Sequence, residues 1–204
     1  MSILRSSFVA ASFAFTAIAA QAATVIPVTQ DGSWYAFTVD ALSAQSGGVE
    51  WIDSDYDLAG GAGDFQALSF TFTVADKAIL KLVDAYTAGD TYNLSITSAS
   101  GTTAYTSSSV AARDLNDAVL PSFNDSFDGA FADSANFSQL TLTLGAGTYT
   151  VTGALLQSVT VDGFALNSTA GGLSVTAVPE PTSLALVLAA AGVVGVVSRR
   201  RARG

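Results

Sequence analysis

The chain of 204 residues contains no cysteine and no histidine. Without cysteine it can form no disulfide, so its fold must depend on burial of a core. Without histidine it can build no Ser-His-Asp or Cys-His arrangement, no histidine general base and no zinc site with nitrogen or sulfur ligands. The enzyme mechanisms that remain are those of carboxylate pairs or of serine with lysine. We expect a protein that is not an enzyme and has no cofactor.

Basic residues are scarce between the two ends of the chain. Residues 23–177 carry three of them, Lys77, Lys81 and Arg113, against sixteen acidic residues, a net charge of −13. Such a surface repels nucleic acid and anionic lipid headgroups, which excludes nucleic-acid binding. The simplest role for this excess of acidic residues is solubility. The alternative is that the negative charge attracts cations or basic partners.

The N-terminal 22 residues have the pattern of an export signal. One basic residue, Arg5, precedes an apolar stretch over residues 8–20, and Ala20-Gln21-Ala22 follows as an A-x-A pattern. These three parts in this order are typical of a secretory signal peptide. We predict that signal peptidase removes residues 1–22 by cutting between Ala22 and Ala23.

The C-terminal 27 residues contain a long segment without charge. Residues 182–198 make seventeen residues, about 25 Å as a helix, which is near the lower limit for a membrane span. Basic residues stay on the cytoplasmic side of a membrane, and a cluster of them follows at once: Arg199, Arg200, Arg201 and Arg203. We predict a single transmembrane helix over residues 184–197, with everything before Pro179 outside the inner membrane.

Val178-Pro179-Glu180-Pro181 stands immediately before this helix. A Pro-Glu-Pro tripeptide, a short apolar helix and a terminal arginine cluster, in that order, resemble the PEP-CTERM sorting signal of Gram-negative bacteria that export polysaccharide. The two prolines hold an extended stretch that a protease can reach. The resemblance covers residues 178–203. It implies that an exosortase cuts at or near Pro179, Glu180 and Pro181, and it links the protein to exopolysaccharide or biofilm at the envelope or in the extracellular matrix.

Strands of period two fill residues 23–177. Residues 68–74 and 140–144 place apolar side chains on one face and hydroxyls on the other, and Gly145-Ala146-Gly147 leads into residues 149–152, which predicts a hairpin. Further short strands are expected at residues 34–39, 79–83, 92–97, 158–162 and 173–177. Glycine- and aspartate-rich turns separate them, so we predict one all-β domain, an antiparallel β-sandwich of jelly-roll or immunoglobulin-like connectivity. Residues 110–131 lack the alternation and hold a short helix or a long loop.

A run of carboxylates offers a candidate calcium site. Asp53, Asp55, Asp57 and Asp64 fall at positions one, three, five and twelve, the spacing of an EF-hand loop. However, Leu58 occupies the position where that loop needs glycine, and no amphipathic helices flank the run. A calcium site on a sandwich loop and a solvated acidic turn both remain open, and we assign no metal ligand.

Four aromatic side chains suit stacking on sugar rings if they are exposed: Trp34, Tyr35, Trp51 and Tyr56. Trp51 and Tyr56 bracket the acidic run, so the alternative function is a carbohydrate-binding module, assisted by calcium in one version. The opposing interpretation is that the tryptophans belong to the core.

A third hypothesis is a glycosidase. Asp125 or Asp128, paired with a distant carboxylate, would supply the dyad for glycoside hydrolysis. The phenylalanines around them are spaced four apart, at Phe123, Phe127 and Phe131. Helical spacing predicts that these rings share one face and anchor the segment to the core.

Overall fold

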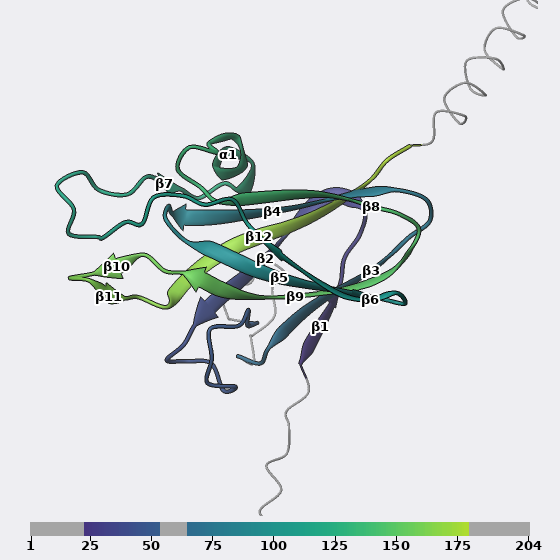
Figure 1. The fold of residues 1–204 in the computed structure, drawn as a ribbon, viewed down its shortest axis with the longest axis horizontal. Helices are drawn as coiled ribbons and strands as arrows, with labels where there is room; N and C mark the ends of the chain where they lie inside the picture. Colours follow the sequence, from purple (N-terminus) through teal and green to yellow (C-terminus); the bar gives the residue numbers. More distant parts are fainter. Residues whose placement is uncertain (1–22, 54–64, 180–204) are drawn as a thin grey trace, which may run out of the picture.

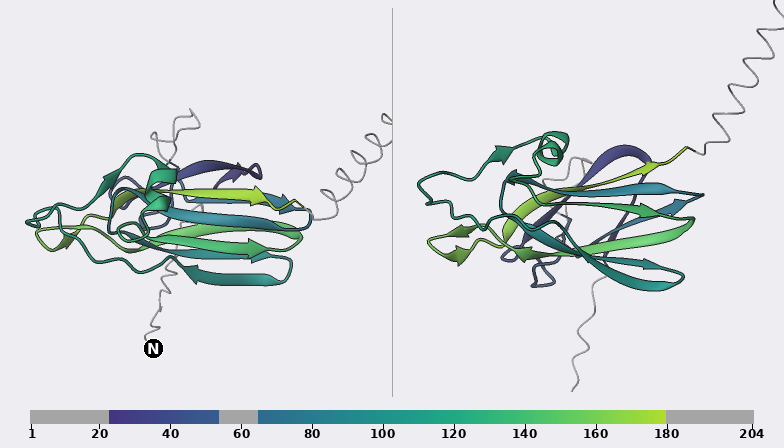
Figure 2. Two further views of the ribbon diagram at one scale, coloured as in Figure 1. Left: turned by 90° about the horizontal axis from the view of Figure 1, so that it is seen from above. Right: turned by 45° about the horizontal axis from the view of Figure 1, so that its top comes forward.

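The computed structural model of the protein describes residues 23–53 and 65–179, and these residues form two β-sheets packed face to face (Figures 1 and 2). The predicted all-β, antiparallel sandwich is therefore confirmed. In chain order the strands are β1 (Thr24–Pro27), β2 (Asp31–Asp40), β3 (Leu68–Val74), β4 (Ala78–Thr87), β5 (Thr91–Ser98), β6 (Gly101–Thr106), β7 (Phe123–Asn124), β8 (Gln139–Leu144), β9 (Gly147–Gln157), β10 (Thr160–Val161), β11 (Phe164–Ala165) and β12 (Ser168–Ala177).

The two sheets take their strands from all parts of the chain. One sheet has the order β1-β3-β9-β5-β6, and the other has the order β2-β12-β4, with β7 and β8 each pairing with β4. Every pair is antiparallel except β1 with β3. Strands β10 and β11 form a separate small hairpin at the end of the sandwich away from the C-terminal end of β12 (Figure 1).

The hairpin predicted for residues 140–152 is wrong. Strand β8 pairs with β4 in one sheet, whereas β9 pairs with β3 and β5 in the other. The two residues between Leu144 and Gly147 therefore carry the chain across from sheet to sheet. The connection from Val74 to Ala78 does the same beside it, since Leu144 is the partner of Ala78 and Gly147 is the partner of Val74. The alternation of apolar residues determines which face of a strand is buried, but it does not determine which strand it pairs with. The same pattern is therefore compatible with a hairpin and with two strands in different sheets.

The core lies between the sheets and is rich in aromatic rings. Phe37 of β2 stacks on Trp51 with the ring centroids 3.9 Å apart, and Tyr92 of β5 meets Phe37 edge-on at 5.1 Å. The apolar side of each long strand faces this layer, which includes Phe70, Leu80, Leu82, Leu94, Val151, Leu173 and Val175. The alternation that predicted residues 68–74 as a strand is thus the alternation that fills the core.

The segment around Trp51 closes one edge of the sandwich by bonding to both sheets. The Trp51 N–H donates to the Gly153 carbonyl in β9 at 2.8 Å, and the Trp51 carbonyl accepts from the Leu68 N–H in β3 at 2.7 Å. The Ile52 N–H donates to the Thr38 carbonyl of β2, in the opposite sheet, at 2.8 Å. Trp51 is carried into the core by these bonds.

A short helix, α1 (Phe127–Ala132), covers the outer face of the second sheet. Ser126 caps it, since its Oγ accepts from the Gly129 N–H at 3.3 Å. Phe127 and Phe131 pack on Trp34 with centroid distances of 5.8 and 5.9 Å. Phe123 lies before the helix in β7 and is 68% exposed, so the three phenylalanines do not share one buried face as the spacing predicted.

Residues 23–53 and 65–179 contain no helix of the length and apolarity that a bilayer crossing requires. The predicted signal peptide at residues 1–22 and the predicted transmembrane helix at residues 184–197 lie outside the described residues.

Candidate functional site

A pocket of about 360 Å³ opens at the end of the sandwich where β12 begins. Strands β2, β4 and β12 supply most of its wall, and Phe65, Asp90, Val159 and Leu166 complete it. The lining residues are Ala36, Thr38, Asp40, Phe65, Tyr86, Thr87, Asp90, Val159, Leu166, Ser168, Thr169 and Ala170. This volume lies within the range of small-molecule sites in proteins.

The two aromatic rings of the wall come from residues with unusual backbone geometry. Phe65 has φ +55° and Tyr86 has φ +63°, a left-handed conformation that is rare for bulky residues. Such a conformation costs on the order of 1–3 kcal/mol, and it persists where the surrounding structure imposes it. Tyr86 also contacts Phe123, with the ring centroids 6.2 Å apart, so it links the pocket to the exposed surface near β7.

Asp90 is the buried acid of the pocket. Its Oδ1 accepts from the Val159 N–H at 2.7 Å, and its Oδ2 accepts a short hydrogen bond from the Thr169 hydroxyl. Only 2% of the residue is exposed. Burial raises the pKa of Asp90 to about 6, although the bonds from Thr169 and Val159 act in the opposite direction.

A second buried acid, Asp84 of β4, lies behind Asp90. Its Oδ2 accepts from the Gly89 and Asp90 N–H groups at 3.2 and 3.3 Å. Burial, and then the charge of Asp90, raise the pKa of Asp84 well above its ordinary value. A protonated Asp84 beside an ionised Asp90 is the arrangement that two neighbouring buried carboxyls favour.

The hydroxyl of Tyr92 completes this buried cluster. It lies 3.4 Å from Asp84 Oδ1, 3.4 Å from the Thr169 hydroxyl and 3.3 Å from the Ala170 carbonyl. Burial, together with the neighbouring charges of Asp84 and Asp90, raises the pKa of Tyr92, which therefore stays protonated. The Tyr92 hydroxyl has a single proton and can donate to only one of these three groups. Its oxygen can also accept, so a protonated Asp84 can donate its proton to the tyrosine oxygen.

No cation neutralises the pair of acids within the part of the chain that the structure describes. The three basic residues there are Lys77, Lys81 and Arg113. Lys81 Nζ sits 4.8 Å from the centre of the Phe131 ring, and Lys77 lies in the turn before β4. The Cβ and Cγ of Arg113 approach Gly89, yet no charge of opposite sign acts on Asp84 or Asp90.

The structure removes Trp51 from the predicted sugar-binding residues. Trp51 is fully buried and stacked on Phe37, so it has no free face for a sugar ring. This corrects the prediction, and the reason is that three strands bond to its segment and draw the ring inward. Tyr56, its predicted partner, lies outside the described residues.

The other predicted aromatics have structural contacts. Trp34 is half-buried, and its Nε1 donates to Asp128 Oδ1 at 2.8 Å. The Tyr35 hydroxyl bonds to the Thr29 side chain at 2.8 Å. Asp128 therefore anchors α1 to β2, and neither it nor Asp125 lines the pocket, which separates the predicted glycosidase dyad from this site.

The predicted calcium run is described only at Asp53, because Asp55, Asp57 and Asp64 lie outside the described residues. Within residues 23–53 and 65–179, no three acidic side chains gather in a way that would hold a metal ion.

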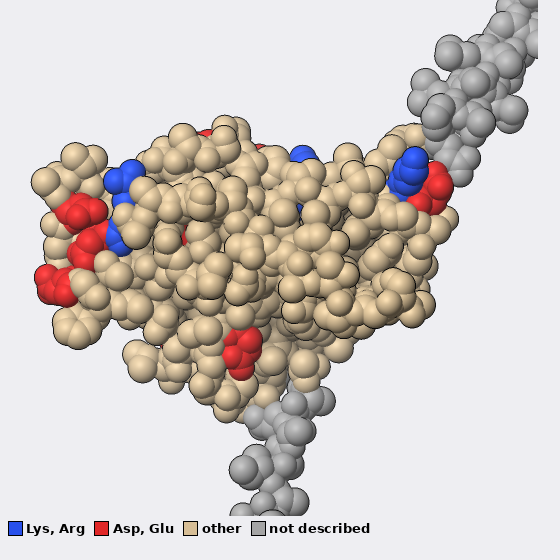
Figure 3. Space-filling model, in the orientation of Figure 1, with Lys and Arg blue, Asp and Glu red and all other residues tan. Residues whose placement is uncertain are grey.

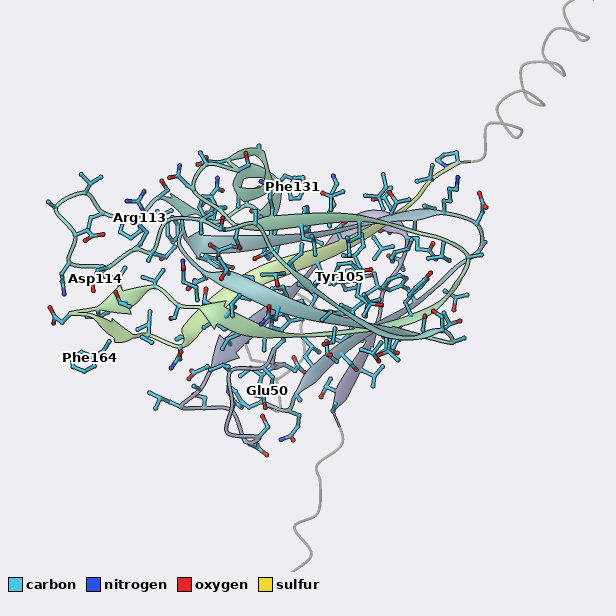
Figure 4. All side chains as sticks on the ribbon, viewed as in Figure 1. Glu50, Tyr105, Arg113, Asp114, Phe131 and Phe164 are labelled. Carbon is cyan, nitrogen blue, oxygen red and sulfur yellow. The ribbon has the colours of Figure 1, made fainter. Side chains whose placement is uncertain are left out.

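Acidic side chains do gather at the end of the sandwich that holds β10 and β11 (Figure 3). Asp114, labelled there in Figure 4 beside Arg113, accepts from the Thr160 hydroxyl at 2.7 Å and from the Gly163 N–H at 2.8 Å. These bonds, with one from the Asn116 N–H, lower the pKa of Asp114 to about 2. Its carboxylate ties the loop to the hairpin and is a structural group.

Comparison with known proteins locates one motif in this chain. Residues 177–201 match the PEP-CTERM protein-sorting motif. The resemblance of the tail is thereby confirmed, and the PEP-CTERM motif begins at the last residue of β12. No curated protein matches the chain.

Two solved structures resemble the sandwich. The pre-peptidase C-terminal domain of a collagenase from Bacillus anthracis is 11% identical, with 76% of this chain and 98% of that chain covered and a TM-score of 0.35. The surface-associated copper-binding protein CorA of Methylomicrobium album BG8 is 10% identical, with 77% and 99% covered and a TM-score of 0.39.

The sequence alone did not single out Asp84 or Asp90. The available signal was Asp84 itself, a charged residue that follows the apolar pair Leu82-Val83 within a strand. A charge there is expected to be exposed by alternation or buried with partners. The partners of Asp84 are the Gly89 and Asp90 N–H groups and the Tyr92 hydroxyl, all within eight residues of it along the chain. The partners of Asp90 lie in β12 and after β9.

Proposed function

We propose that the protein is an exported, non-enzymatic protein of the cell envelope or extracellular matrix, sorted and cut by an exosortase through its PEP-CTERM tail. In this proposal signal peptidase removes residues 1–22, residues 184–197 anchor the chain in the inner membrane, and the arginine cluster stays in the cytoplasm. The released domain would then reside among exopolysaccharide or biofilm material.

The proposal is supported by the position at which the sandwich ends, immediately before the Pro-Glu-Pro tripeptide. The last strand closes at Ala177, whose N–H donates to the Gln30 carbonyl at 3.0 Å, and the Val178 N–H donates to the Lys77 carbonyl at 2.9 Å. Pro179 follows, with no N–H to donate. A cut at or near Pro179, Glu180 and Pro181 therefore leaves all described strands intact.

The state of the pocket carboxyls supports a non-enzymatic role. Asp40 caps its own turn, since its Oδ1 accepts from the Leu42 and Ser43 N–H groups at 3.0 and 3.1 Å and its Oδ2 from the Ser43 hydroxyl at 2.9 Å. Asp90 holds Val159 and Thr169. Both acids of the pocket thus position the backbone, which differs from a pair of carboxyls set to donate and accept a substrate proton.

Substitution of the tripeptide tests the sorting step. The full chain, its Glu180→Ala variant and a variant lacking residues 178–204 are expressed in a host that has an exosortase and in the same host without it. Glu50→Ala is the matched control, because Glu50 is the other glutamate of the chain and lies in the globular part. Intact-mass spectrometry of the exported protein reports both cleavages.

The wild type and Glu50→Ala are expected to lose residues 1–22 and the tail only where the exosortase is present. Glu180→Ala is expected to keep its tail and stay with the inner membrane. If deletion of residues 178–204 changes neither the mature mass nor the location, the proposal is wrong.

A further inference from the structure

The pocket combines apolar walls with a buried acid. Phe65, Tyr86, Val159 and Leu166 supply rings and branched carbons, whereas Asp90 supplies a carboxylate next to Asp84. A site of this kind selects a ligand by one polar group and by the shape of its apolar part.

The acceptor capacity of Asp90 is not used up. Each carboxylate oxygen has two lone pairs, and the structure gives Oδ1 one donor, the Val159 N–H, and Oδ2 one donor, the Thr169 hydroxyl. A donor entering from the pocket can therefore bond to Asp90 without breaking either bond that holds it.

The negative charge of the site favours a cationic ligand. Asp90 faces Asp84 and Tyr92 on its inner side, and Asp40 and Tyr86 are the other titratable groups that line the pocket. The Cβ and Cγ of Arg113 lie beside Gly89, but the Arg113 charge is not among the groups that shift the pKa of Asp90. None of the groups facing Asp90 in residues 23–53 and 65–179 is a positive partner, and the net charge of −13 over residues 23–177 attracts cations toward the pocket.

The walls decide which kind of cation fits. A hard metal ion takes six to eight oxygen ligands, and the described residues gather no three acidic side chains around one point. Aromatic faces and branched carbons instead suit an organic cation, which gains from apolar burial and from the attraction between a cation and an aromatic ring.

The pocket also lies far from Ala177, the last residue of β12. It lies at the Ser168–Ala170 end of β12, and the tail follows Ala177 at the other end, roughly 25 Å along the strand (Figure 1). A ligand can therefore reach the pocket while the domain is tethered at its opposite end.

We propose that this pocket binds a small hydrophobic organic cation, with its ammonium group on the Asp90 carboxylate and its aromatic or branched part between Phe65, Tyr86 and Leu166. The proposal is independent of the sorting step. It assigns to this end of the sandwich a binding activity that the PEP-CTERM motif does not describe.

Two probes of equal shape and different charge test it. 2-Phenylethylammonium and 2-phenylethanol are titrated by calorimetry into the full chain held in zwitterionic lipid nanodiscs, with empty nanodiscs as the reference. At pH 7.5 the ammonium is expected to bind about 10–100-fold more tightly, the range for a hydrogen bond to a charged group. At pH 5 the preference falls about tenfold, because one unit below a pKa of about 6 roughly a tenth of Asp90 remains ionised.

Three variants separate the parts of the site. Asp90→Asn keeps the shape of the side chain and is expected to bind both probes with equal, weak affinity. Leu166→Trp fills the mouth and is expected to bind neither. Val25→Trp, on the exposed side of β1 and outside the pocket, is the matched control and is expected to behave as wild type.

The proposal is overturned if wild type binds neither probe at millimolar concentration, or if it binds the alcohol as tightly as the ammonium at pH 7.5. Equal binding by Leu166→Trp and wild type also overturns it, since the probes would then bind elsewhere. If Asp90→Asn does not fold, the pH profile of the wild type and the Leu166→Trp variant still decide the question.

Discussion

Gly153 lies directly against the indole ring of Trp51. A Cβ at Gly153 would stand 2.6 Å from Trp51 Cδ2, and closer still to Cε2 and Cζ2. The same two residues are joined by the 2.8 Å bond from the Trp51 N–H to the Gly153 carbonyl. The edge segment and β9 therefore approach as closely as they do because residue 153 has no side chain.

Gly153→Ala is expected to destabilise the protein by about 1–3 kcal/mol, the usual cost of overpacking a core. The Trp51 ring, stacked on Phe37, has no room to retreat. Urea unfolding followed by tryptophan fluorescence measures the loss. Gly145→Ala is the control, because an added Cβ there meets no atom within 4 Å, and we expect a change within about 0.5 kcal/mol. Equal effects of the two substitutions would refute the packing argument.

The buried acid pair gives the protein an unusual dependence on pH. The folded state raises the pKa of Asp90 from 3.8 to about 6, so folding favours the protonated acid. The associated stability is fully present below pH 3.8 and is lost as the pH rises through 6, about 3 kcal/mol for a shift of about two units. Asp84 shifts in the same direction and extends the loss to higher pH. Chemical denaturation at several pH values from 4 to 7 measures the slope.

Asp90→Asn removes the titrating group and keeps most of the shape. Between pH 4 and 6 the free energy of unfolding of the variant is expected to depend less on pH, because the contribution of Asp90 is gone. The variant is therefore expected to gain stability relative to wild type as the pH rises. Asp114 behaves oppositely, since its pKa is lowered to about 2, and its contribution is lost only in strong acid. An Asp90→Asn variant that is equally destabilised at pH 4 and pH 7 would contradict the assignment.

The bond from Trp34 to Asp128 holds α1 on the sheet. Trp34→Phe keeps an aromatic ring against Phe127 and Phe131 but loses the 2.8 Å bond to the carboxylate. We expect a loss of about 0.5–1.5 kcal/mol in the free energy of unfolding. Asp128→Asn retains an acceptor oxygen and is expected to cost less. Asp128→Ala removes the acceptor, and a double-mutant cycle of Trp34→Phe with Asp128→Ala that shows no coupling would exclude the bond as a stabilising contact.

The cap of α1 can be tested independently. Ser126→Ala removes the acceptor for the Gly129 N–H and is expected to destabilise the protein by about 1 kcal/mol. Ser126→Asp restores an acceptor and is expected to recover most of that loss. Thermal unfolding of the three proteins distinguishes a cap from a surface serine, because a surface serine would make all three alike.

The sequence by itself determined the sorting motif and where the long strands lie. The motif at residues 177–201 is contiguous, so its parts can be read in order along the chain. Strand β3 coincides with the predicted residues 68–74, and β8 contains the predicted residues 140–144. Both could be predicted because the alternation of side-chain direction is a local property of a strand. Burial of one face then made the class of fold predictable.

Only the tertiary structure determined which strands pair and which distant residues come into contact. Residues 140–144 and 149–152 fit a hairpin equally well, and it is the pairing of β8 with β4 that sends them to different sheets. Trp51 could be surface or core until bonds to β2, β3 and β9 carried it inward. Asp90 meets Thr169 across 79 positions of the chain, and that contact, with the burial around it, makes an ordinary aspartate the acid of a pocket. Local sequence sets which way a side chain points; which distant residue it then meets depends on how the whole chain closes around its core.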